Sequence, residues 1–560
     1  STRQNRGDDL ILQSVEAQPC GDCFCISDKE YFMSTAQTLD NSTHGESLPT
    51  VTKALEPLKG GALVMLTVAT ALATFMEVLD TTIANVSVPT IAGTMGVSAN
   101  EGTSIISSYS LAAAIAVPLT GWLSRRIGEV RLIMLSVTLF TIFSVLCGLA
   151  TNYNMLVFFR LMQGLVSGPM VPLGQSIMMN AYPPAKRGMA MAFWAMTVVI
   201  APVIGPLLGG YITENYSWPW IFYINVPIGI FCVYSIGTLL KGRESSISKE
   251  PIDVIGLVLL VIGVGSLQYM LEHANNLGWF ESTEVITLTV MAVVGLTFLV
   301  IWEWYDKHPV VDLQLVRNRN FSVGTLLQTV GFTIFFGNVV VIPLWLQTVM
   351  GYDALHSGLA TSPVALFAIF FSPVIGMNMH RVDLRWLIFT GFGLFAFGAW
   401  YSSGLSPQST IGEVMLGRFL FGLGIPFFFI PLSSLMMQGL NGRELVSAAG
   451  LSNFLRTLGG AIGTAVFVTL WSRRISFHHA RLGEDLHPGN PMYDQFMAQL
   501  ANGGMSSGAR YATLDGLISQ QAATMATLDV LYLSAGLFVV MMFCVFFAKP
   551  VKGAVATAGH

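Results

Sequence analysis

Residues 103–150 read TSIISSYSLAAAIAVPLTGWLSRRIGEVRLIMLSVTLFTIFSVLCGLA. The stretch holds two long apolar segments, and the short loop between them carries Arg125, Arg126 and Arg131. A helical segment of about 20 apolar residues is long enough to cross the hydrocarbon core of a bilayer. The stretch therefore predicts two membrane-spanning helices joined by a short basic loop.

The same pattern recurs along most of the chain. The segments are too long for the strands of a membrane barrel, and they do not alternate polar with apolar residues. With 53% hydrophobic and 11% charged residues, the chain differs from soluble domains, in which charged residues make up about 25%. We predict an all-α polytopic membrane protein with fourteen spans, at 61–80, 103–123, 131–150, 154–179, 188–212, 220–240, 252–272, 283–304, 321–349, 355–379, 385–403, 411–438, 447–471 and 528–547.

The loops alternate in charge. Of the 28 Lys and Arg residues, 16 lie in every second loop or after the last span, whereas the short loops between them carry none. Positive charge is retained on the cytoplasmic side of a membrane, so we expect both termini to be cytoplasmic. Of the remaining 12, five lie in the N-terminal tail, four in one long outer loop and three inside spans. The formal net charge of −4 gives no reason to expect a nucleic-acid partner.

An internal repeat relates the two ends of the chain. Pro118-x-x-Gly121 recurs as Pro373-x-x-Gly376, and Arg160 with Gly164 recurs as Arg418 with Gly422. Parallel repeats of this kind are typical of transporters. We predict two six-helix bundles, 61–240 and 321–550, separated by two inserted helices and linkers at 241–320. The remaining parts are a disordered cytoplasmic tail at 1–60, a long periplasmic loop at 472–527 within the second bundle, and a short tail at 551–560.

Ionisable residues inside spans indicate function, because each costs roughly 2.5–3.5 kcal/mol on insertion scales. The first span holds Glu77 and Asp80 on one helix face, and the fourth holds Arg160 and Gln163 at the same spacing. Burial disfavours a charged carboxylate, whereas a nearby Arg favours it. A site with both can bind or release a proton as their separation changes. The alternative for Arg160 is a fixed ion pair between helices, and for Asp80 a solvated helix end.

The sequence contains no motif for ATP binding, metal binding or enzyme catalysis. There is no GxxxxGK[ST] motif for ATP, no metal-spaced His cluster and no nucleophile elbow. Cys20, Cys23 and Cys25 lack further ligands for a four-coordinate metal site. We therefore expect no enzyme activity and no cofactor, and a proton gradient as the source of energy.

Taken together, the motifs resemble the fourteen-span drug:proton antiporter branch (the EmrB/QacA type) of the major facilitator superfamily. The resemblance covers residues 60–550. It rests on Leu79–Val86 followed by Pro89, Arg160-x-x-Gln163-Gly164, Gly205-Pro206-x-x-Gly209-Gly210, 220–227 and 452–460.

The resemblance implies a rocker-switch multidrug exporter in a bacterial inner membrane. It implies hydrophobic, often weakly acidic drugs as substrates, protons as the driving ion, a periplasmic EmrA-type adaptor and a TolC-type outer-membrane channel. Asp80, Glu77, Arg160 and Gln163 are the candidates for proton coupling. The candidates for substrate binding or gating are Arg418, Arg456, Asn85, Trp194, Phe336, Phe371 and Asn453, and the structural motifs comprise Gly205, Pro206, Gly209, Gly210, Gly121 and Arg126.

One position departs from the family pattern. The loop after the second span has Arg125 where the general superfamily motif has Asp, so we expect another acid to take over the gating contact. Two other functions also stay open. One is a dedicated exporter of a single metabolite, such as a siderophore or a fatty acid. The other is a non-transporting membrane sensor or scaffold, against which the repeat and the intramembrane charges argue.

Overall fold

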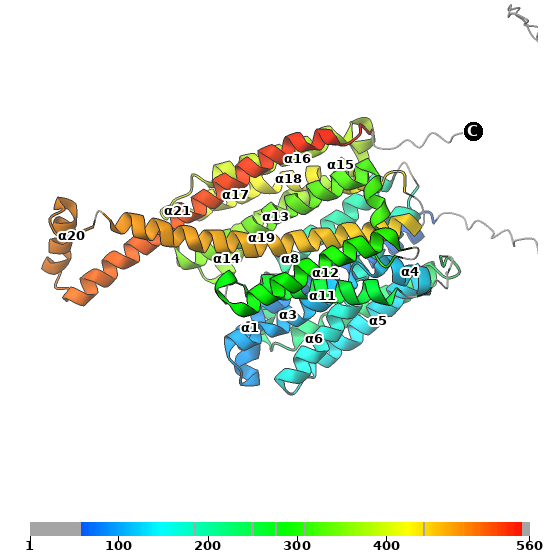
Figure 1. Cartoon of the computed structure of the whole chain (residues 1–560), viewed down its shortest axis with the longest axis horizontal. Helices are drawn as coiled ribbons and strands as arrows, with labels where there is room; N and C mark the ends of the chain where they lie inside the picture. The colour runs from blue at the N-terminus through cyan, green and yellow to red at the C-terminus, as the bar shows by residue number, and fades with distance from the viewer. Residues whose placement is uncertain are drawn as a thin grey trace, which may run out of the picture. The chain divides into compact units, whose positions relative to one another are not determined.

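The computed structural model describes residues 58–551, apart from 184–185, 246, 248–250, 252, 275–276, 307–308, 441–442 and 485. Residues 1–57 and 552–560 of the predicted tails, with Cys20, Cys23 and Cys25, lie outside these residues. The described residues belong to one compact unit, and their secondary structure is helical (Figure 1). The N-terminal part comprises α1 (Gly61–Met95), α2 (Ala99–Gly102), α3 (Ser104–Ala116), α4 (Thr120–Ile127), α5 (Glu129–Gly148), α6 (Tyr153–Ser167), α7 (Met170–Ala181), α8 (Arg187–Asn215), α9 (Trp220–Tyr223) and α10 (Asn225–Leu239).

The middle and C-terminal parts follow the predicted order. The inserted pair, as we call it, comprises α11 (Val254–His273) and α12 (Thr283–Tyr305), with η2 (Trp279–Glu281) between them and η3 (Leu313–Arg317) after them. The C-terminal part comprises α13 (Arg319–Thr348), α14 (Ala354–Thr361), α15 (Pro363–Asn378), η4 (Met379–Arg381), α16 (Leu384–Ser402), α17 (Ile411–Gly422), α18 (Gly424–Met436), α19 (Arg443–Gly483), α20 (Pro491–Asn502), α21 (Ser507–Cys544) and η5 (Val545–Phe547).

The described residues contain 11 helices long and apolar enough to cross a membrane. Two bent pairs reach the same standard together, namely α3 with α4, bent by 63°, and the two parts of α8, bent by 45°. The first bend falls around Pro118, since proline removes a helical hydrogen bond and clashes with the preceding turn. The predicted span 385–403 coincides with α16, which is not among the 11, so the number fourteen stays a prediction.

The internal repeat is visible in equivalent glycine contacts. A Cβ added to Gly164 of α6 would lie 2.3 Å from the Tyr109 carbonyl oxygen. A Cβ on Gly422 of α17 would lie 2.1 Å from the Val364 carbonyl oxygen. In each half, glycine thus allows one helix backbone to approach another more closely than any other residue could.

The two halves meet at the ends of the spans that carry Arg125, Arg126, Arg187, Arg381 and Arg385, which we call the basic end. There, a Cβ on Gly121 of α4 would lie 2.8 Å from Ser447 Oγ of α19. A Cβ on Gly376 of α15 would lie 2.6 Å from the Gly188 carbonyl oxygen of α8. The halves are therefore in van der Waals contact at the basic end.

The segment 472–527, which we expected to be a long loop, is mostly helical. Helix α19 runs on to Gly483 and α21 begins at Ser507, with α20 between them. In Figure 1 this helical hairpin extends beyond the other helices, with α20 at its tip. At its base, Asp529 accepts hydrogen bonds from Arg474 Nε at 2.6 Å and pairs with His478 Nε2 at 2.7 Å. These side-chain contacts, which join residues far apart in sequence, explain why the sequence pattern alone did not reveal the hairpin.

Candidate functional site

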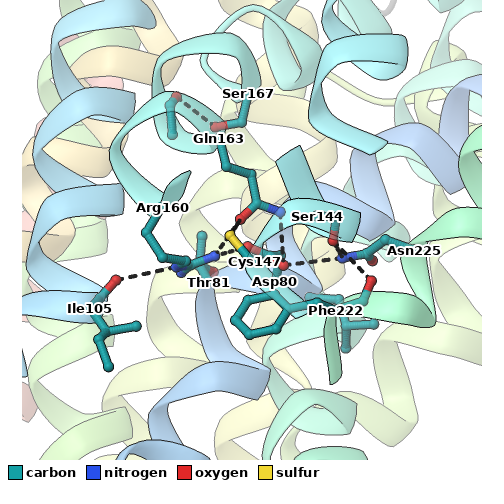
Figure 2. A network of polar contacts seen from close by, with 12 residues as sticks. Asp80, Thr81, Ile105, Ser144, Cys147, Arg160, Gln163, Ser167, Phe222 and Asn225 are labelled. Atoms are coloured by element: carbon teal, nitrogen blue, oxygen red, sulfur yellow. Dashed lines mark hydrogen bonds and ion pairs between the residues drawn. The ribbon is translucent and has the colours of Figure 1, made fainter. Parts of the chain in front are cut away.

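Asp80 lies at the centre of a buried polar network inside the N-terminal half (Figure 2). It stands on α1 and is 1% exposed, while Arg160 and Gln163 of α6 are both fully buried. Arg160 and Gln163 are three residues apart on one helix, so both reach the same face of α6. Three of the four residues predicted for proton coupling are thus brought together.

Arg160 forms the main link in the network. Its Nη1 donates to Asp80 Oδ2 in an ion pair and to Gln163 Oε1 at 2.8 Å. Its Nε donates to the Ile105 carbonyl oxygen at 3.2 Å. The guanidinium also lies 4.2 Å from the centre of the Tyr109 ring, a distance suited to a cation–π contact. Arg160 is therefore held from three sides.

Asp80 Oδ1 accepts from two amides. Gln163 Nε2 lies 3.4 Å away and Asn225 Nδ2 of α10 lies 3.1 Å away. Asn225 Nδ2 also donates to Ser144 Oγ of α5, at 3.0 Å. Among these buried atoms, Arg160 Nη2 and Asn225 Oδ1 have no hydrogen-bond partner. One unused donor and one unused acceptor leave the network able to rearrange its hydrogen bonds when Asp80 gains or loses a proton.

Glu77 faces the other half of the protein. It is 8% exposed, lies one turn before Asp80 on α1, and its Oε2 has no hydrogen-bond partner. It interacts electrostatically with Arg456 of α19, although no ion pair within 4.0 Å joins them in the described structure. The Arg456 guanidinium lies 5.9 Å from the Trp194 ring and 5.6 Å from the Phe332 ring. Glu77 thus lies near enough to Arg456 of the C-terminal half to feel its charge, without forming an ion pair with it.

A cavity of about 190 Å³ lies between α8 and the C-terminal half. Its walls are mostly apolar and include six aromatic rings, and Arg418 of α17 is the charged residue among the side chains that line it. Arg418 is 2% exposed and donates to Ser402 Oγ at 3.2 Å, and its Nε has no hydrogen-bond partner. An apolar cavity with one unsatisfied cationic group can hold an amphipathic molecule with an acceptor or a negative charge. The aromatic lining comprises Phe332, Phe335, Phe336, Phe395, Phe428 and Phe429.

The remaining substrate-site candidates divide into two groups. Phe336 lines the cavity, Trp194 packs on Phe429 with ring centres 5.4 Å apart, and Asn453 donates to Gln175 of α7 at 2.7 Å, across the halves. Asn85 is exposed on α1, and Phe371 is 43% exposed and stacks on Phe367 at 3.9 Å. Neither Asn85 nor Phe371 is among the residues that line the cavity.

The glycine motif of α8 packs against α1 directly beside the network. A Cβ on Gly205 would lie 2.1 Å from Thr82 Oγ1, and one on Gly209 would lie 2.5 Å from the Ile83 carbonyl oxygen. Gly210 is half-buried, and the side chain of Pro206 lies outside the described part. The motif therefore lets α8 approach the helix that carries Asp80.

At the basic end, Arg125 itself makes a contact between the halves. Its Nη1 donates to Ser447 Oγ at 3.2 Å, and its Nη2 donates to the Pro309 carbonyl oxygen at 2.9 Å. Arg126 is exposed and lies 5.8 Å from the Trp122 ring. A hydroxyl and a backbone carbonyl thus accept from Arg125, and the substitute acid that we expected stays a prediction.

Sequence reasoning missed several members of the network. Asn225 lies within the motif quoted at 220–227, and that was the one available signal. Ser144 carries no such signal, because serine in a helix commonly bonds its own backbone. Gln175, which accepts from Asn453 outside this network, was not predicted either. No group of three or more His, Cys, Asp or Glu suited to a metal occurs among the described residues.

The comparisons identify the class of protein. A model of the Major Facilitator Superfamily matches residues 70–464, and the chain belongs to this family. Two solved structures agree on the fold at 12% identity. The human organic anion transporter MFSD10 (TETRAN) has a TM-score of 0.56 and covers 87% of this chain and 100% of its own. A double Trp mutant of XylE has a TM-score of 0.53, with 88% and 97% covered.

More similar relatives share nearly the full length. The Multidrug export protein EmrB of Escherichia coli (strain K12) is 45% identical over 500 residues, which are 89% of this chain and 98% of that protein. The protein of the same name in Haemophilus influenzae is 47% identical over 502 residues, with 90% and 98% covered. The Fatty acid resistance protein FarB of Neisseria gonorrhoeae is 43% identical over 494 residues, with 88% and 97% covered. The predicted family and all-α fold are thus confirmed.

Proposed function

We propose that this chain is a proton-coupled multidrug efflux transporter that exports hydrophobic and amphipathic compounds by alternating access. The observation that carries the proposal is the buried carboxylate of Asp80, bound to Arg160 in one half and one turn away from Glu77, which faces Arg456 of the other. Membership of a transporter family and identity of 45–47% to proteins named for multidrug export support it.

The roles of the residues follow from their contacts. Asp80 binds the proton, and Arg160 and Gln163 stabilise its charged form through the ion pair and the amide bond. When Asp80 is neutral, the attraction to Arg160 weakens and the guanidinium is free to take other acceptors. Glu77 responds to the approach of Arg456, so it senses the separation of the halves. The aromatic cavity holds the exported compound.

The orientation and the partners belong to the same proposal. We place the basic end and both termini in the cytoplasm of a bacterial cell, in the inner membrane, because the basic loops lie at that end. The hairpin of α19, α20 and α21 then extends into the periplasm, where it contacts an EmrA-type adaptor that leads to a TolC-type channel. Replacing 484–506 by a short Gly-Ser loop should abolish co-purification of the adaptor and leave transport in vesicles unchanged.

The proposal is tested in energised inside-out vesicles that contain the pump. Hydrophobic drugs that are not themselves protonophores are added while a quenched acridine dye reports the pH gradient. We expect drug to release protons from vesicles that contain wild type. We expect this release to be lost with Asp80→Asn and Glu77→Gln at equal amounts of folded protein. Drug transport that proceeds equally in Asp80→Asn, Glu77→Gln and Arg160→Ala would refute the assigned roles.

One observation favours a narrower function as the second candidate. Arg418 provides a buried cationic group in an apolar cavity, as a fatty-acid carboxylate requires, and one relative is named a fatty acid resistance protein. The test is whether long-chain fatty acids dissipate the pH gradient in an Arg418-dependent way while no drug of the panel does so. In that case the assignment as a dedicated exporter would replace the assignment as a multidrug pump.

A further inference from the structure

Two carboxyl groups meet at the basic end of the inserted pair, far along the chain from Asp80. Asp253 precedes α11, and its Oδ1 accepts the Gly256 N–H at 2.8 Å. Glu303, near the end of α12, is fully buried. A Cβ added to Gly256 would lie 2.1 Å from Asp253 Oδ2 and 2.7 Å from Glu303 Oε1. The two oxygens therefore lie within about 5 Å of each other, where like charges repel strongly.

The hydrogen bonds around the two groups are unevenly distributed. Trp302 Nε1 donates to both carboxylate oxygens of Asp253 at 3.0 Å. The Val311 N–H donates to Glu303 Oε2 at 3.3 Å, whereas the buried Glu303 Oε1 has no hydrogen-bond partner. The oxygen without a partner is the one that lies on the Asp253 side. A proton held between the two carboxyl groups would give Glu303 Oε1 the hydrogen bond that it lacks.

Neighbouring elements do not supply a balancing cation in the described part of the chain. The charged groups they bring to this end are Asp306 after α12, Asp312 and Arg317 at η3, and Arg125 of α4. No ion pair joins any of them to Asp253 or Glu303. Two carboxylates that share a buried site do not both ionise readily.

We propose that Asp253 and Glu303 form a second proton-binding site, which holds one proton between the two carboxyl groups at the basic end of the inserted pair. This site lies outside the Asp80 network, and it does not depend on the proposed function. Its ligand is a proton, because the buried Glu303 Oε1 lacks a hydrogen-bond partner and lies on the side of the Asp253 carboxyl group.

The shared proton would act on a linker that is connected to both halves through Arg125. Residues 309–311 follow α12, and Val311 is bound to Glu303 while the Pro309 carbonyl accepts from Arg125. Arg125 also donates to Ser447 of the C-terminal half. Loss of the proton makes Glu303 a stronger acceptor for Val311, but it also leaves two like charges within about 5 Å. Their repulsion exceeds the gain from one hydrogen bond, so it displaces the Glu303 side chain and loosens the linker. Protonation therefore favours the closed basic end.

The first measurement is infrared spectroscopy of the purified full chain in lipid nanodiscs, without drug or gradient. A protonated carboxyl group gives a C=O stretching band that a carboxylate lacks. We expect the difference spectrum, wild type minus Glu303→Gln, to show this band at neutral pH and to lose it at high pH. Glu284→Gln, on an exposed position of the same helix, serves as the matched control and should leave the band in place.

The second measurement is hydrogen exchange of the linker peptide, corrected for the intrinsic effect of pH. In wild type we expect exchange at 309–313 to rise several-fold as the band disappears. A glutamine at 303 can donate to Asp253 and accept from Val311 at every pH, so Glu303→Gln should remain protected throughout. Asp253→Asn gives a second variant if Glu303→Gln folds poorly.

Two results would overturn the proposal. One is an infrared band that Glu303→Gln and Asp253→Asn both leave unchanged. The other is a rate of hydrogen exchange in the linker that is the same in wild type and in Glu303→Gln at every pH. The Asp80→Asn variant, which should abolish drug-driven proton release, should keep both signatures, so failure of this site and failure of the proposed function are distinguishable.

Discussion

Asp80 and Arg160 form an ion pair in which neither side chain is exposed at all. Such a pair is costly to break from one side, because the remaining charge stays buried without its partner. The two partners differ in what they can do when left alone. A carboxylate can take up a proton and become neutral, whereas a guanidinium cannot lose its charge in a protein.

The first prediction follows from this difference. Asp80→Asn should lower the free energy of unfolding by about 3–5 kcal/mol, and Arg160→Gln by clearly less. The double variant should recover most of the stability without recovering proton coupling. Thermal unfolding of the purified protein checks this order, and equal losses in the two single variants would contradict it.

The second prediction concerns the repeated glycines. Gly164→Ala and Gly422→Ala each place a Cβ against a backbone carbonyl oxygen, which cannot move aside as a flexible side chain can. We expect each variant to lose about 1–3 kcal/mol of stability. Gly536→Ala, where a Cβ meets nothing within 4 Å, is the matched control and should melt like wild type.

The third prediction concerns Arg418 in the aromatic cavity. Arg418→Gln should weaken binding of a long-chain carboxylate by about ten- to a hundred-fold, since hydrogen bonds to charged groups contribute about 1.5–3 kcal/mol. Binding of the alcohol of equal chain length should change little. Equilibrium binding to protein in nanodiscs measures both, and an equal loss for acid and alcohol would refute a role for the charge.

The fourth prediction is a pH dependence at Asp383, which caps α16 at the basic end. Burial opposes ionisation of this carboxyl, but hydrogen bonds and charge from Arg385 outweigh it and hold the pKa below the ordinary value of 3.8. A lowered folded-state pKa stabilises the protein above the ordinary pKa, and this stabilisation is lost as the pH falls through the folded-state value. Asp383→Asn, which keeps a capping oxygen, should therefore reduce stability at neutral pH.

The size of this effect at Asp383 is modest. We expect less than about 1 kcal/mol, because the pair is partly solvated. Melting temperatures of wild type and Asp383→Asn, compared between neutral pH and the most acidic pH that the folded protein tolerates, should converge. A difference that stays constant with pH would show that the ion pair contributes nothing.

The fold was predictable because its main signals are local. Segment length, the basic loops and the spacing of Arg160, Gln163 and Gly164 are all read within single helices. Pro118 and Pro373 occupy repeat-equivalent positions, yet only the first lies at a bend between two helices, while the second lies inside α15. The packing around each proline decides this, and the sequence pattern does not contain it.

The site was predictable only in part, because it joins residues far apart in sequence. Asp80, Arg160 and Gln163 stand out as polar groups inside apolar spans. Asn225 of α10 reaches the Asp80 carboxylate and Ser144 of α5 accepts from Asn225, and nothing in their own surroundings indicates which helix faces them. Arg125 was recognised as unusual, but its actual acceptors, Ser447 and Pro309, depend on the placement of the halves.

Helix α19 has a mechanical consequence. It is continuous over 41 residues, from the basic end, where Ser447 contacts Arg125, to the helical hairpin at the opposite end. At 1.5 Å per residue such a rod is about 60 Å long. As a rigid rod it would act as a lever: a tilt of about 10° at one end would displace the other by roughly 10 Å. Opening of the basic end would thus be transmitted, as a large excursion, to the far side of the membrane.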